Sequence, residues 1–406
     1  MLVNFIRKSN SKDQIIYKSK KLYPLNKNKI LLVGMSDSPH FQRWIESTRQ
    51  SFPGLKILVF PSDRPRFARR KLVNSSFLRR NKFKTFFLVP NKKLNFVLYY
   101  VLDIVIGIKW RSYFLARFII KHRPYIIHFH EMQHGSYIFN PIFNYRKIPT
   151  NIKKIISTWG SDLVLYSWVD GHKKQIEMSL SWADIVTAER KDEHLIATKL
   201  GFTGEFKAPI YITLGLGDSE IQCKTKPSQR RIILVKGHQS DTGRALNFLS
   251  VLPNSLELLS NFEILVYSAS QSVALQVDYL RNAKNIDIRT LPKVSHSEMV
   301  DLFQQARISI SLSVSDGLPG VLVEAMSNGA FPIQSINSAA SYFISQGKNG
   351  YIVDPWDLDG ISSALNSALT NDAMVDEANE LSRQILNSRY NIDTGVSLLK
   401  SLYSDN

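Results

Sequence analysis

The stretch SLSVSDGLPGVLVEAMSNG, residues 311–329, decides the fold. Its apolar run ends at Ser313 and predicts a β-strand, a D-G-L-P loop follows, and a helix is expected to begin near Gly320 and to end at Gly329. Proline and glycine are suited to the start and the end of such a helix. This arrangement directs the N–H groups of the helix's first turn toward the carboxyl end of the strand, where a diphosphate is the natural ligand.

Two acidic residues flank this predicted anion site. Glu324 lies one turn into the helix, four residues after Gly320, and a carboxylate there can accept hydrogen bonds from both hydroxyls of a ribose. Asp316 precedes Glu324 by eight positions and can reach a different hydroxylated group beside the same phosphates. We expect the loop and the helix start to contact the same phosphate ligand through Leu318, Pro319, Gly320 and Val321.

Outward from this stretch, short apolar runs alternate with helical patterns along the chain. Strands are expected at residues 29–34, 55–61, 125–130 and 153–160, and again at 231–237, 262–268, 285–292, 307–313 and 330–335. Helical stretches such as 244–252 and 297–306 lie between them. This alternation predicts an α/β protein with parallel sheets that are covered on both faces.

The length of the chain and the two series of strands predict two domains. A chain of 406 residues exceeds the roughly 100–200 residues of one ordinary domain. The polar stretch DSEIQCKTKPSQR at 218–230 lacks periodicity and is the expected linker. We therefore assign residues 1–222 to an N-terminal domain and residues 223–375 to a C-terminal domain.

The composition favours a folded protein of a reducing compartment. The single cysteine, Cys223, cannot form a disulfide within the chain, and the first residues contain no apolar stretch of the signal-peptide kind. The longest apolar stretch, residues 94–108, is shorter than the roughly 20 residues that a membrane-spanning helix needs. These features predict a cytoplasmic protein.

Positive charge is concentrated in one segment. The net charge is +18, and residues 64–123 hold sixteen Lys or Arg against one acid, Asp103, with aromatic residues interleaved. Such a surface suits anionic lipid headgroups and predicts a peripheral protein on the inner face of the cell membrane. A solvated charged face and a nucleic-acid surface are the alternatives, of which nucleic acid fits least.

The motifs of the second series resemble those of family 4 retaining glycosyltransferases. The stretch S-D-G-L-P-G-V-L-V-E-A-M-S-N-G is similar to the family pattern E-G-x-P-x-x-x-x-E-A-M-A-x-G, and GKNGYIVDPWDLDGISSAL at 347–365 is similar to its downstream G-x-N-G-x-x-V-x-P-x-D run. The order of elements agrees over residues 230–395. The resemblance implies the GT-B fold, in which two Rossmann-like, doubly wound domains face a cleft and a C-terminal helix, here at 376–406, crosses back to the N-terminal domain. It also implies that the N-terminal domain, residues 1–222, binds the acceptor and that the C-terminal domain, residues 223–375, binds the nucleotide-sugar donor.

The resemblance also implies roles for individual residues. Glu324 would hold the donor ribose, and Asp316 would contact the donor sugar as a catalytic residue, one methylene shorter than the family's glutamate. Lys236 and Arg244 would bind the donor phosphates, with the family's arginine and lysine exchanged. Gly34 occupies the position of the family's acceptor-domain loop that faces those phosphates.

A histidine-rich stretch, HFHEMQHG at 128–135, follows a predicted strand. It lacks the helical H-E-x-x-H spacing of zinc sites, so no metal is expected. His130, Glu131 and His134 are candidates for contact with the donor or the acceptor, with His134 as a catalytic candidate, and core or surface positions are the alternative. Asp162 lies in TWGSD, which resembles a family T-x-H-G-x-D stretch whose histidine is missing here, so the assignment of the acid and base stays open.

Together these features predict a retaining hexosyltransferase that moves a sugar from a UDP- or GDP-sugar to a hydroxyl acceptor. The basic segment suggests a lipid-linked saccharide as acceptor, as in bacterial polysaccharide or lipopolysaccharide assembly. No cofactor or metal is expected, because the helix N-terminus, Lys236 and Arg244 can supply the positive field. Two alternatives stay open: a sugar-nucleotide epimerase on the same fold, and a basic scaffold that binds membrane or nucleic acid without catalysis.

Overall fold

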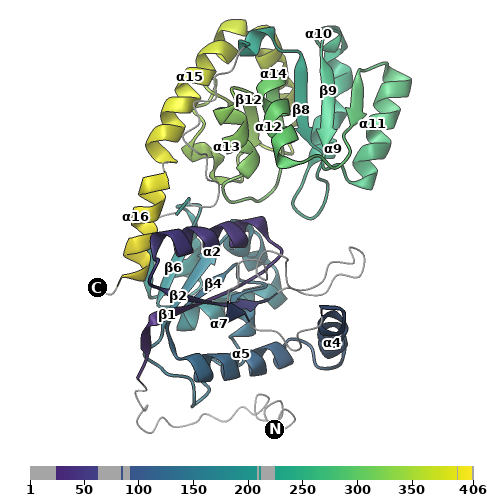
Figure 1. Ribbon diagram of the computed structural model, residues 1–406. Helices are drawn as coiled ribbons and strands as arrows, with labels where there is room; N and C mark the ends of the chain where they lie inside the picture. The colour runs from purple at the N-terminus through teal and green to yellow at the C-terminus, as the bar shows by residue number, and fades with distance from the viewer. Residues whose placement is uncertain are drawn as a thin grey trace. The chain divides into compact units, whose positions relative to one another are not determined.

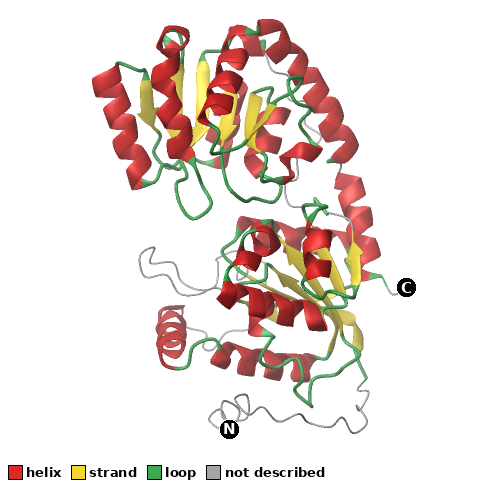
Figure 2. Cartoon of the chain, turned by 180° about the vertical axis from the view of Figure 1, so that it is seen from behind, coloured by secondary structure: helices red, strands yellow, loops and turns green. Residues whose placement is uncertain are grey.

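The computed structural model describes residues 24–62, 84–85, 92–207, 210–211, 225–390 and 392–404. The chain forms two compact units (Figure 1). Unit 1 consists of Met1–Gly215 with Asp393–Asn406, and unit 2 consists of Leu216–Ile392. In each unit the strands form one sheet that lies between helices (Figure 2). The predicted α/β class with two Rossmann-like, doubly wound domains is confirmed.

The sheet of unit 1 has seven strands in the order β3-β2-β1-β4-β5-β6-β7, and every neighbouring pair is parallel. The strands are β1 (Asn26–Gly34), β2 (Lys56–Pro61), β3 (Lys84–Thr85), β4 (Pro124–His130), β5 (Lys153–Thr158), β6 (Ile185–Ala188) and β7 (Glu205–Lys207). The strand order reverses between β1 and β4. In open α/β sheets, ligands bind beyond the carboxyl ends of the strands at such a reversal.

The central strands of unit 1 are apolar on both faces because helices cover both sides of the sheet. In β1, Leu31 and Val33 belong to one apolar cluster and Ile30 and Leu32 to another, and all four are fully buried. This is why the run KILLVG reads as continuously apolar rather than alternating. The helices of the unit are α2 (Pro39–Ser51), α4 (Lys92–Val105), α5 (Lys109–His122), η2 (Ser136–Ile138), α6 (Ser161–Val164), η3 (Tyr166–Trp168), α7 (Asp170–Trp182), α8 (Glu193–Lys199) and α16 (Ile392–Tyr403).

The sheet of unit 2 has six parallel strands in the order β10-β9-β8-β11-β12-β13. The strands are β8 (Ile232–Lys236), β9 (Glu263–Tyr267), β10 (Ile288–Thr290), β11 (Ala306–Ser311), β12 (Phe331–Ser335) and β13 (Tyr351–Val353). The helices are η4 (Pro227–Gln229), α9 (Ala245–Val251), η5 (Leu252–Ser255), α10 (Leu256–Leu259), α11 (Gln271–Lys284), α12 (His296–Gln305), α13 (Gly320–Ser327), η6 (Ala339–Tyr342), α14 (Leu358–Thr370) and α15 (Asp372–Arg389). The strand order reverses between β8 and β11, which places a second switch point beside the 311–329 stretch.

The C-terminal segment expected at 376–406 is divided between the units. Helix α15 belongs to unit 2 and contributes to its core, whereas α16 belongs to unit 1. Tyr403 anchors α16: its hydroxyl accepts a hydrogen bond from Trp44 Nε1 at 3.0 Å and lies 2.7 Å from His128 Nδ1. The chain therefore returns to unit 1 at the junction of the two helices.

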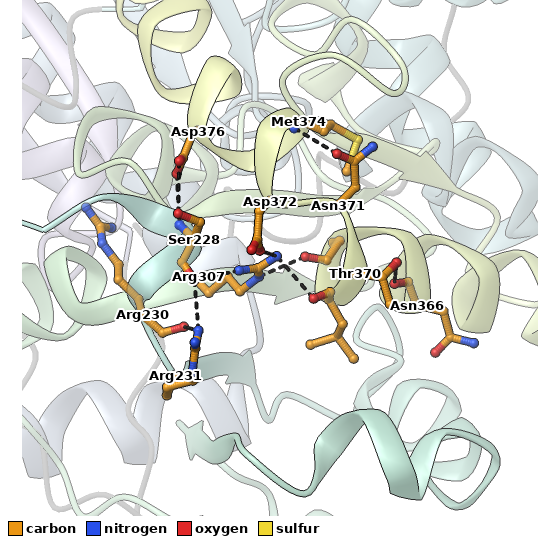
Figure 3. Close-up of polar contacts among 12 residues, drawn as sticks. Ser228, Arg230, Arg231, Arg307, Asn366, Thr370, Asn371, Asp372, Met374 and Asp376 are labelled. Atoms are coloured by element: carbon orange, nitrogen blue, oxygen red, sulfur yellow. Dashed lines mark hydrogen bonds and ion pairs between the residues drawn. The ribbon is translucent and has the colours of Figure 1, made fainter.

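A buried arginine ties β11 to two helices of unit 2 (Figure 3). Arg307 donates hydrogen bonds to the carbonyls of Ala368 at 2.9 Å and Leu369 at 3.1 Å, which are among the last of α14. It also donates to Ser228 O at 2.8 Å and lies 2.7 Å from Asp372 at the start of α15. Since Arg307 is at the amino end of β11, this network lies at the end of the strand opposite the 311–329 loop.

The nine expected strands all form, and the helical stretches at 244–252 and 297–306 correspond to α9 and α12. The two- to four-residue strands β3, β6, β7 and β13 were not expected from the sequence. Residues 218–224 of the expected linker, with Cys223, lie outside the described residues, as does most of the basic segment before residue 92. Across the residues that the structure describes, no helix combines the length and apolar character needed to cross a membrane.

Candidate functional site

The anion site predicted from the 311–329 stretch lies in unit 2 at the carboxyl end of β11. Pro319 has an extended backbone (φ −65°, ψ 119°) and immediately precedes α13, which begins at Gly320 as predicted. Asp316 N donates a hydrogen bond to Asn337 O at 3.0 Å, so the loop is fixed to the segment that follows β12. The first N–H groups of α13 have no carbonyl partner within the helix, which suits them to bind an anion.

Leu318 and Val321 support this loop through their side chains. Leu318 is buried, and Val321 packs against the apolar cluster beneath α13. Their predicted donor contacts stay predictions, as do those of Pro319 and Gly320.

Glu324 lies among groups from two other elements. Its Oε1 is 3.1 Å from Nε2 of His296, the first residue of α12. The hydroxyl of Tyr267, at the end of β9, is buried without a hydrogen-bond partner. Burial raises the pKa of Tyr267, and the negative charge of Glu324 adds to that effect. His296 and Tyr267 could not be recognised from the sequence, because they lie on separate elements that only the fold brings to Glu324.

A second group of side chains gathers where β8 ends. Lys236 is the last residue of β8, and His238 follows in the next loop. Burial lowers the pKa of His238, the positive charge of Lys236 lowers it further, and the negative charge of Asp316 opposes both effects. Lys236 and Asp316 therefore each lie within electrostatic reach of His238. His238 belongs to no motif, so it could not be recognised from the sequence as a site residue.

Arg244 organises the loop between β8 and α9. Its Nη1 donates hydrogen bonds to the carbonyls of Ser240 at 2.8 Å and Gly243 at 2.7 Å. Its guanidinium carbon lies 4.7 Å from the ring centroid of Trp356, an exposed tryptophan that follows β13. A Cβ atom on Gly243 would lie 2.1 Å from His238 O, so this tight loop requires glycine. The structure gives Arg244 a loop-holding role, and its phosphate contact stays a prediction.

In unit 1, the first two histidines of the 128–135 stretch are core residues. His128 links Tyr403 Oη to Ser157 Oγ, each at 2.7 Å. The centroid of the His130 ring lies 4.9 Å from that of the Trp44 ring. Neither nitrogen of the His130 ring has a hydrogen-bond partner. Burial lowers the pKa of His128 to about 3 and holds the pKa of His130 well below its usual value. Both rings are therefore neutral near pH 7.

Glu131 and His134 form a pair at the carboxyl end of β4. Glu131 has a left-handed backbone (φ 65°), and its Oε1 lies 2.8 Å from His134 Nδ1. Both side chains are partly accessible, with exposed fractions of 15% for Glu131 and 24% for His134. A Cβ atom on Gly135 would lie 2.4 Å from Glu131 O, so glycine permits the tight turn. His134 is thus an oriented, accessible imidazole, and its catalytic role stays a prediction.

Asp162 joins the loops that follow β4 and β5. It accepts hydrogen bonds from the backbone N–H groups of Met132 and Trp159, each at 2.6 Å. Burial raises the pKa of Asp162 to about 7, and the negative charge of Glu131 adds to the effect. Nearby, the buried Glu193 accepts a hydrogen bond from Thr158 Oγ1 at 2.5 Å, and burial raises its pKa well above the ordinary value. Glu193 was not found from the sequence, where it reads as an ordinary helix residue.

Gly34, the predicted donor-facing glycine, has a packing reason to be glycine. A Cβ atom there would lie 2.8 Å from the Phe41 ring, so the ring occupies the space that a side chain would need. The Gly34 carbonyl accepts a hydrogen bond from Ser62 N at 2.9 Å, which joins the ends of β1 and β2. The contact with donor phosphates stays a prediction.

A metal site would require several acidic, histidine or cysteine side chains to lie close together. Within the described ranges, no group of three or more His, Cys, Asp or Glu side chains is placed to hold a metal ion.

Comparison with known proteins identifies the second unit. Residues 219–386 match the family model of glycosyl transferases group 1. The chain is a glycosyltransferase. The matched stretch of this glycosyltransferase covers most of unit 2 and contains Lys236, Arg244, Asp316 and Glu324. A search of the curated proteins found no match to the chain.

Solved structures share the architecture of the whole glycosyltransferase. Sucrose-phosphate synthase from Thermosynechococcus elongatus matches with a TM-score of 0.67 at 14% identity, over 93% of this chain and 98% of that one. Anabaena HepE in complex with UDP-glucose matches with a TM-score of 0.66 at 12% identity, over 92% and 99%. The lipopolysaccharide outer core galactosyltransferase WaaB matches with a TM-score of 0.64 at 15% identity, over 92% and 99%. These likenesses establish the GT-B fold.

Proposed function

We propose that this glycosyltransferase is a retaining enzyme of family 4 that transfers a hexose from a UDP- or GDP-sugar to a hydroxyl acceptor. The observation that carries the donor assignment is the first turn of α13 at the carboxyl end of β11, with Glu324 one turn further along. The structure of Anabaena HepE, which shares the fold, was solved with UDP-glucose, and this supports a nucleotide-sugar donor.

The groups around α13 fit the charge changes of the reaction. The bond from the anomeric carbon to the diphosphate oxygen breaks, a bond to the acceptor oxygen forms on the same face, and the acceptor proton passes to the departing phosphate. The first-turn N–H groups and Lys236 stabilise the charge that accumulates on the leaving group. Glu324 binds the ribose and Asp316 holds the donor sugar. Because this positive field comes from the protein itself, we propose that no cofactor or metal is needed.

On the acceptor side, His134 is a second proposed catalytic residue beside Asp316, and its role is to orient the acceptor hydroxyl through a hydrogen bond while the proton passes to the departing phosphate. Glu131 engages its Nδ1 at 2.8 Å, which leaves Nε2 to meet the hydroxyl that attacks the donor. Glu131 is thereby a positioning residue. This assignment uses only groups of unit 1.

The acceptor that we propose is a lipid-linked saccharide at an anionic membrane surface on the inner face of the cell membrane. Helix α4 exposes apolar side chains, with exposed fractions of 66% for Ile104 and 74% for Val105. Arg117 and Lys121 are exposed on α5, the next helix in the chain. Exposed aliphatic groups on one helix and basic side chains on the next helix in the chain suit the boundary between headgroups and acyl chains.

Thermal-shift measurements with a panel of nucleoside diphosphates and their sugars test the donor site. One nucleotide should stabilise the wild type, by about 2.7 kcal/mol at 100 times its Kd, and Glu324→Ala should abolish the effect. Glu377→Ala, an exposed glutamate on α15, is the matched control and should respond as the wild type does. Full stabilisation or full transfer activity in Glu324→Ala would overturn the assignment. No stabilisation by any nucleotide would favour a basic scaffold without catalysis.

A further inference from the structure

The carboxylate of Glu324 is held by a side chain from a neighbouring helix. Its Oε1 lies 3.1 Å from Nε2 of His296. Because an ionised carboxylate only accepts hydrogen bonds, Nε2 of His296 is the donor. The hydroxyl of Tyr267 also lies within electrostatic reach of Glu324, but it has no hydrogen-bond partner. Of these two neighbours, His296 is therefore the one that fixes the direction of the carboxylate.

The start of α12 fixes the backbone that carries His296. The N-cap residue Ser295 accepts a hydrogen bond from Glu298 N at 3.3 Å through its hydroxyl, and its own N–H donates to Glu298 Oε2 at 2.6 Å. These two bonds close a capping box, and His296 is the first helical residue after the cap. The position of the imidazole at the end of α12 is therefore set by local hydrogen bonds.

A shared apolar cluster places α12 beside α13 (Figure 1). Met299 of α12 and Val321 of α13 pack against this cluster, and Ala325 of α13 belongs to it. Ala325 is fully buried and directly follows Glu324, so its burial fixes the turn of α13 that carries the carboxylate. The approach of His296 to Glu324 therefore follows from the packing of two helices and does not depend on their hydrogen bond.

The hydrogen bond between His296 and Glu324 is open to solvent. The side chain of His296 is 65% exposed and that of Glu324 is 20% exposed. A polar contact with this exposure is screened by water and contributes little to the free energy of unfolding. Its effect is on orientation, because it reduces the number of side-chain conformations that a ligand would otherwise have to restrict on binding. Since Glu324 keeps some accessible surface, a ligand can reach it.

We propose that His296 is a positioning residue of the donor site, which holds Glu324 in the orientation that receives the ribose hydroxyls. This inference rests on the proposed binding of the donor ribose by Glu324 and adds the residue that controls it. It has a specific consequence: His296 strengthens the binding of a nucleotide only when the ribose hydroxyls are present. A residue that merely stabilised α12 would affect ribose and dideoxyribose nucleotides alike.

Isothermal titration calorimetry with UDP, GDP and their 2′,3′-dideoxy forms tests this on the whole protein. The wild type should bind the preferred ribonucleotide about tenfold more tightly than its dideoxy form, because hydrogen bonds to a charged group are lost with the hydroxyls. His296→Ala should bind the ribonucleotide about fivefold more weakly than the wild type and the dideoxy form equally well. His296→Gln should restore ribonucleotide binding, because the amide Nε2 can donate from a similar place.

Asp301→Ala, at an exposed position later on α12, is the matched control and should bind both forms as the wild type does. Equal weakening of both forms by His296→Ala, no weakening, or a failure of His296→Gln to restore binding overturns the positioning role. Tighter ribonucleotide binding by His296→Ala also overturns it, because His296 would then compete with the ribose for the carboxylate.

Glu324→Ala separates this proposal from the donor assignment. If Glu324→Ala loses ribonucleotide binding while His296→Ala keeps it, the donor site stands and only the role of His296 is wrong. If the wild type binds no nucleotide, or if Glu324→Ala binds as the wild type does, the donor assignment fails and the role of His296 fails with it.

Discussion

At the scale of single residues, His130 is packed against aromatic rings and makes no hydrogen bond through its ring nitrogens. This burial determines how its contribution to the free energy of unfolding changes with pH. Its pKa is lowered by burial and by the neighbouring His128. In the unfolded chain a histidine has a pKa of about 6.5. As the pH falls below that value, the unfolded chain binds a proton that the folded chain does not. The contribution of neutral His130 to the free energy of unfolding is therefore fully present above the pKa that histidine has in the unfolded chain. It is lost progressively as the pH falls below that value.

Replacing His130 by leucine should remove part of this acid sensitivity. Between pH 7 and pH 5, the free energy of unfolding of His130→Leu should fall by about 2 kcal/mol less than that of the wild type. Urea denaturation at both pH values measures this. Asp162, whose pKa is raised to about 7, has the opposite pH dependence but is present in both proteins, so it cancels in the difference. His194→Gln, at an exposed position, should keep the wild-type dependence. Equal pH dependence in His130→Leu would show that His130 does not contribute.

At the scale of elements, the sequence predicts those parts that depend on local pattern. Helix α13 begins at Gly320 because the preceding proline and loop specify a helix start that can be read without tertiary structure. Strand β13 spans only Tyr351–Val353, which is too short for periodicity to be read. Tyr267 and His296 reach Glu324 from β9 and α12, and only the order of strands in the sheet makes them neighbours.

Basic residues show the same limit of sequence-based prediction. Arg244 has the residue type and position of a phosphate ligand, yet its side chain also fits the loop that it occupies. Arg307 belongs to no motif in the sequence, yet it is 1% exposed and caps the end of α14. A sequence gives the charge of such residues, whereas their partners depend on backbone carbonyls that come from distant elements.

Arg307 should therefore stabilise unit 2 through the helices that it joins. Replacing Arg307 by methionine removes the hydrogen bonds to the carbonyls at the end of α14 and leaves Asp372 without its partner. We expect a loss of about 3–5 kcal/mol in the free energy of unfolding, because each lost hydrogen bond from the charged guanidinium to a carbonyl is worth about 1.5–3 kcal/mol, whereas Asp372 is mostly exposed and its ion pair adds little. Guanidinium denaturation with probes for each unit measures the loss and should place it in unit 2.

The matched control for this change is Arg383→Met on α15. Arg383 is half exposed and pairs with Glu380 at 3.1 Å one turn away, so its loss should cost less than about 1 kcal/mol. A similar loss in both variants would mean that the β11 network contributes no more than a surface ion pair. The donor-binding loop lies at the other end of β11, and we expect nucleotide affinity of the folded Arg307→Met protein to be retained.

At the scale of the whole molecule, the net charge of +18 acts together with the apolar surface of α4. Charge alone attracts a protein to anionic lipid over about one Debye length, roughly 10 Å at 0.1 M salt and roughly 3 Å at 1 M. Exposed aliphatic groups act only on contact and are insensitive to salt screening. If both contribute, binding to anionic vesicles should weaken with salt and should also depend on Ile104, which is 66% exposed.

Sedimentation with vesicles separates these two contributions. The wild type should bind vesicles of phosphatidylglycerol and phosphatidylethanolamine at low salt, and bind vesicles of phosphatidylcholine weakly. Ile104→Asp should reduce binding at low salt by about tenfold. It removes apolar surface that would be buried in the membrane on binding, and it adds a negative charge at the protein surface. Leu275→Asp makes the same change in charge at a leucine of unit 2 that is also 66% exposed, and it should bind as the wild type does. Equal losses in both variants would show that overall charge determines membrane binding, whereas absence of sedimentation in the wild type would contradict a membrane-bound acceptor.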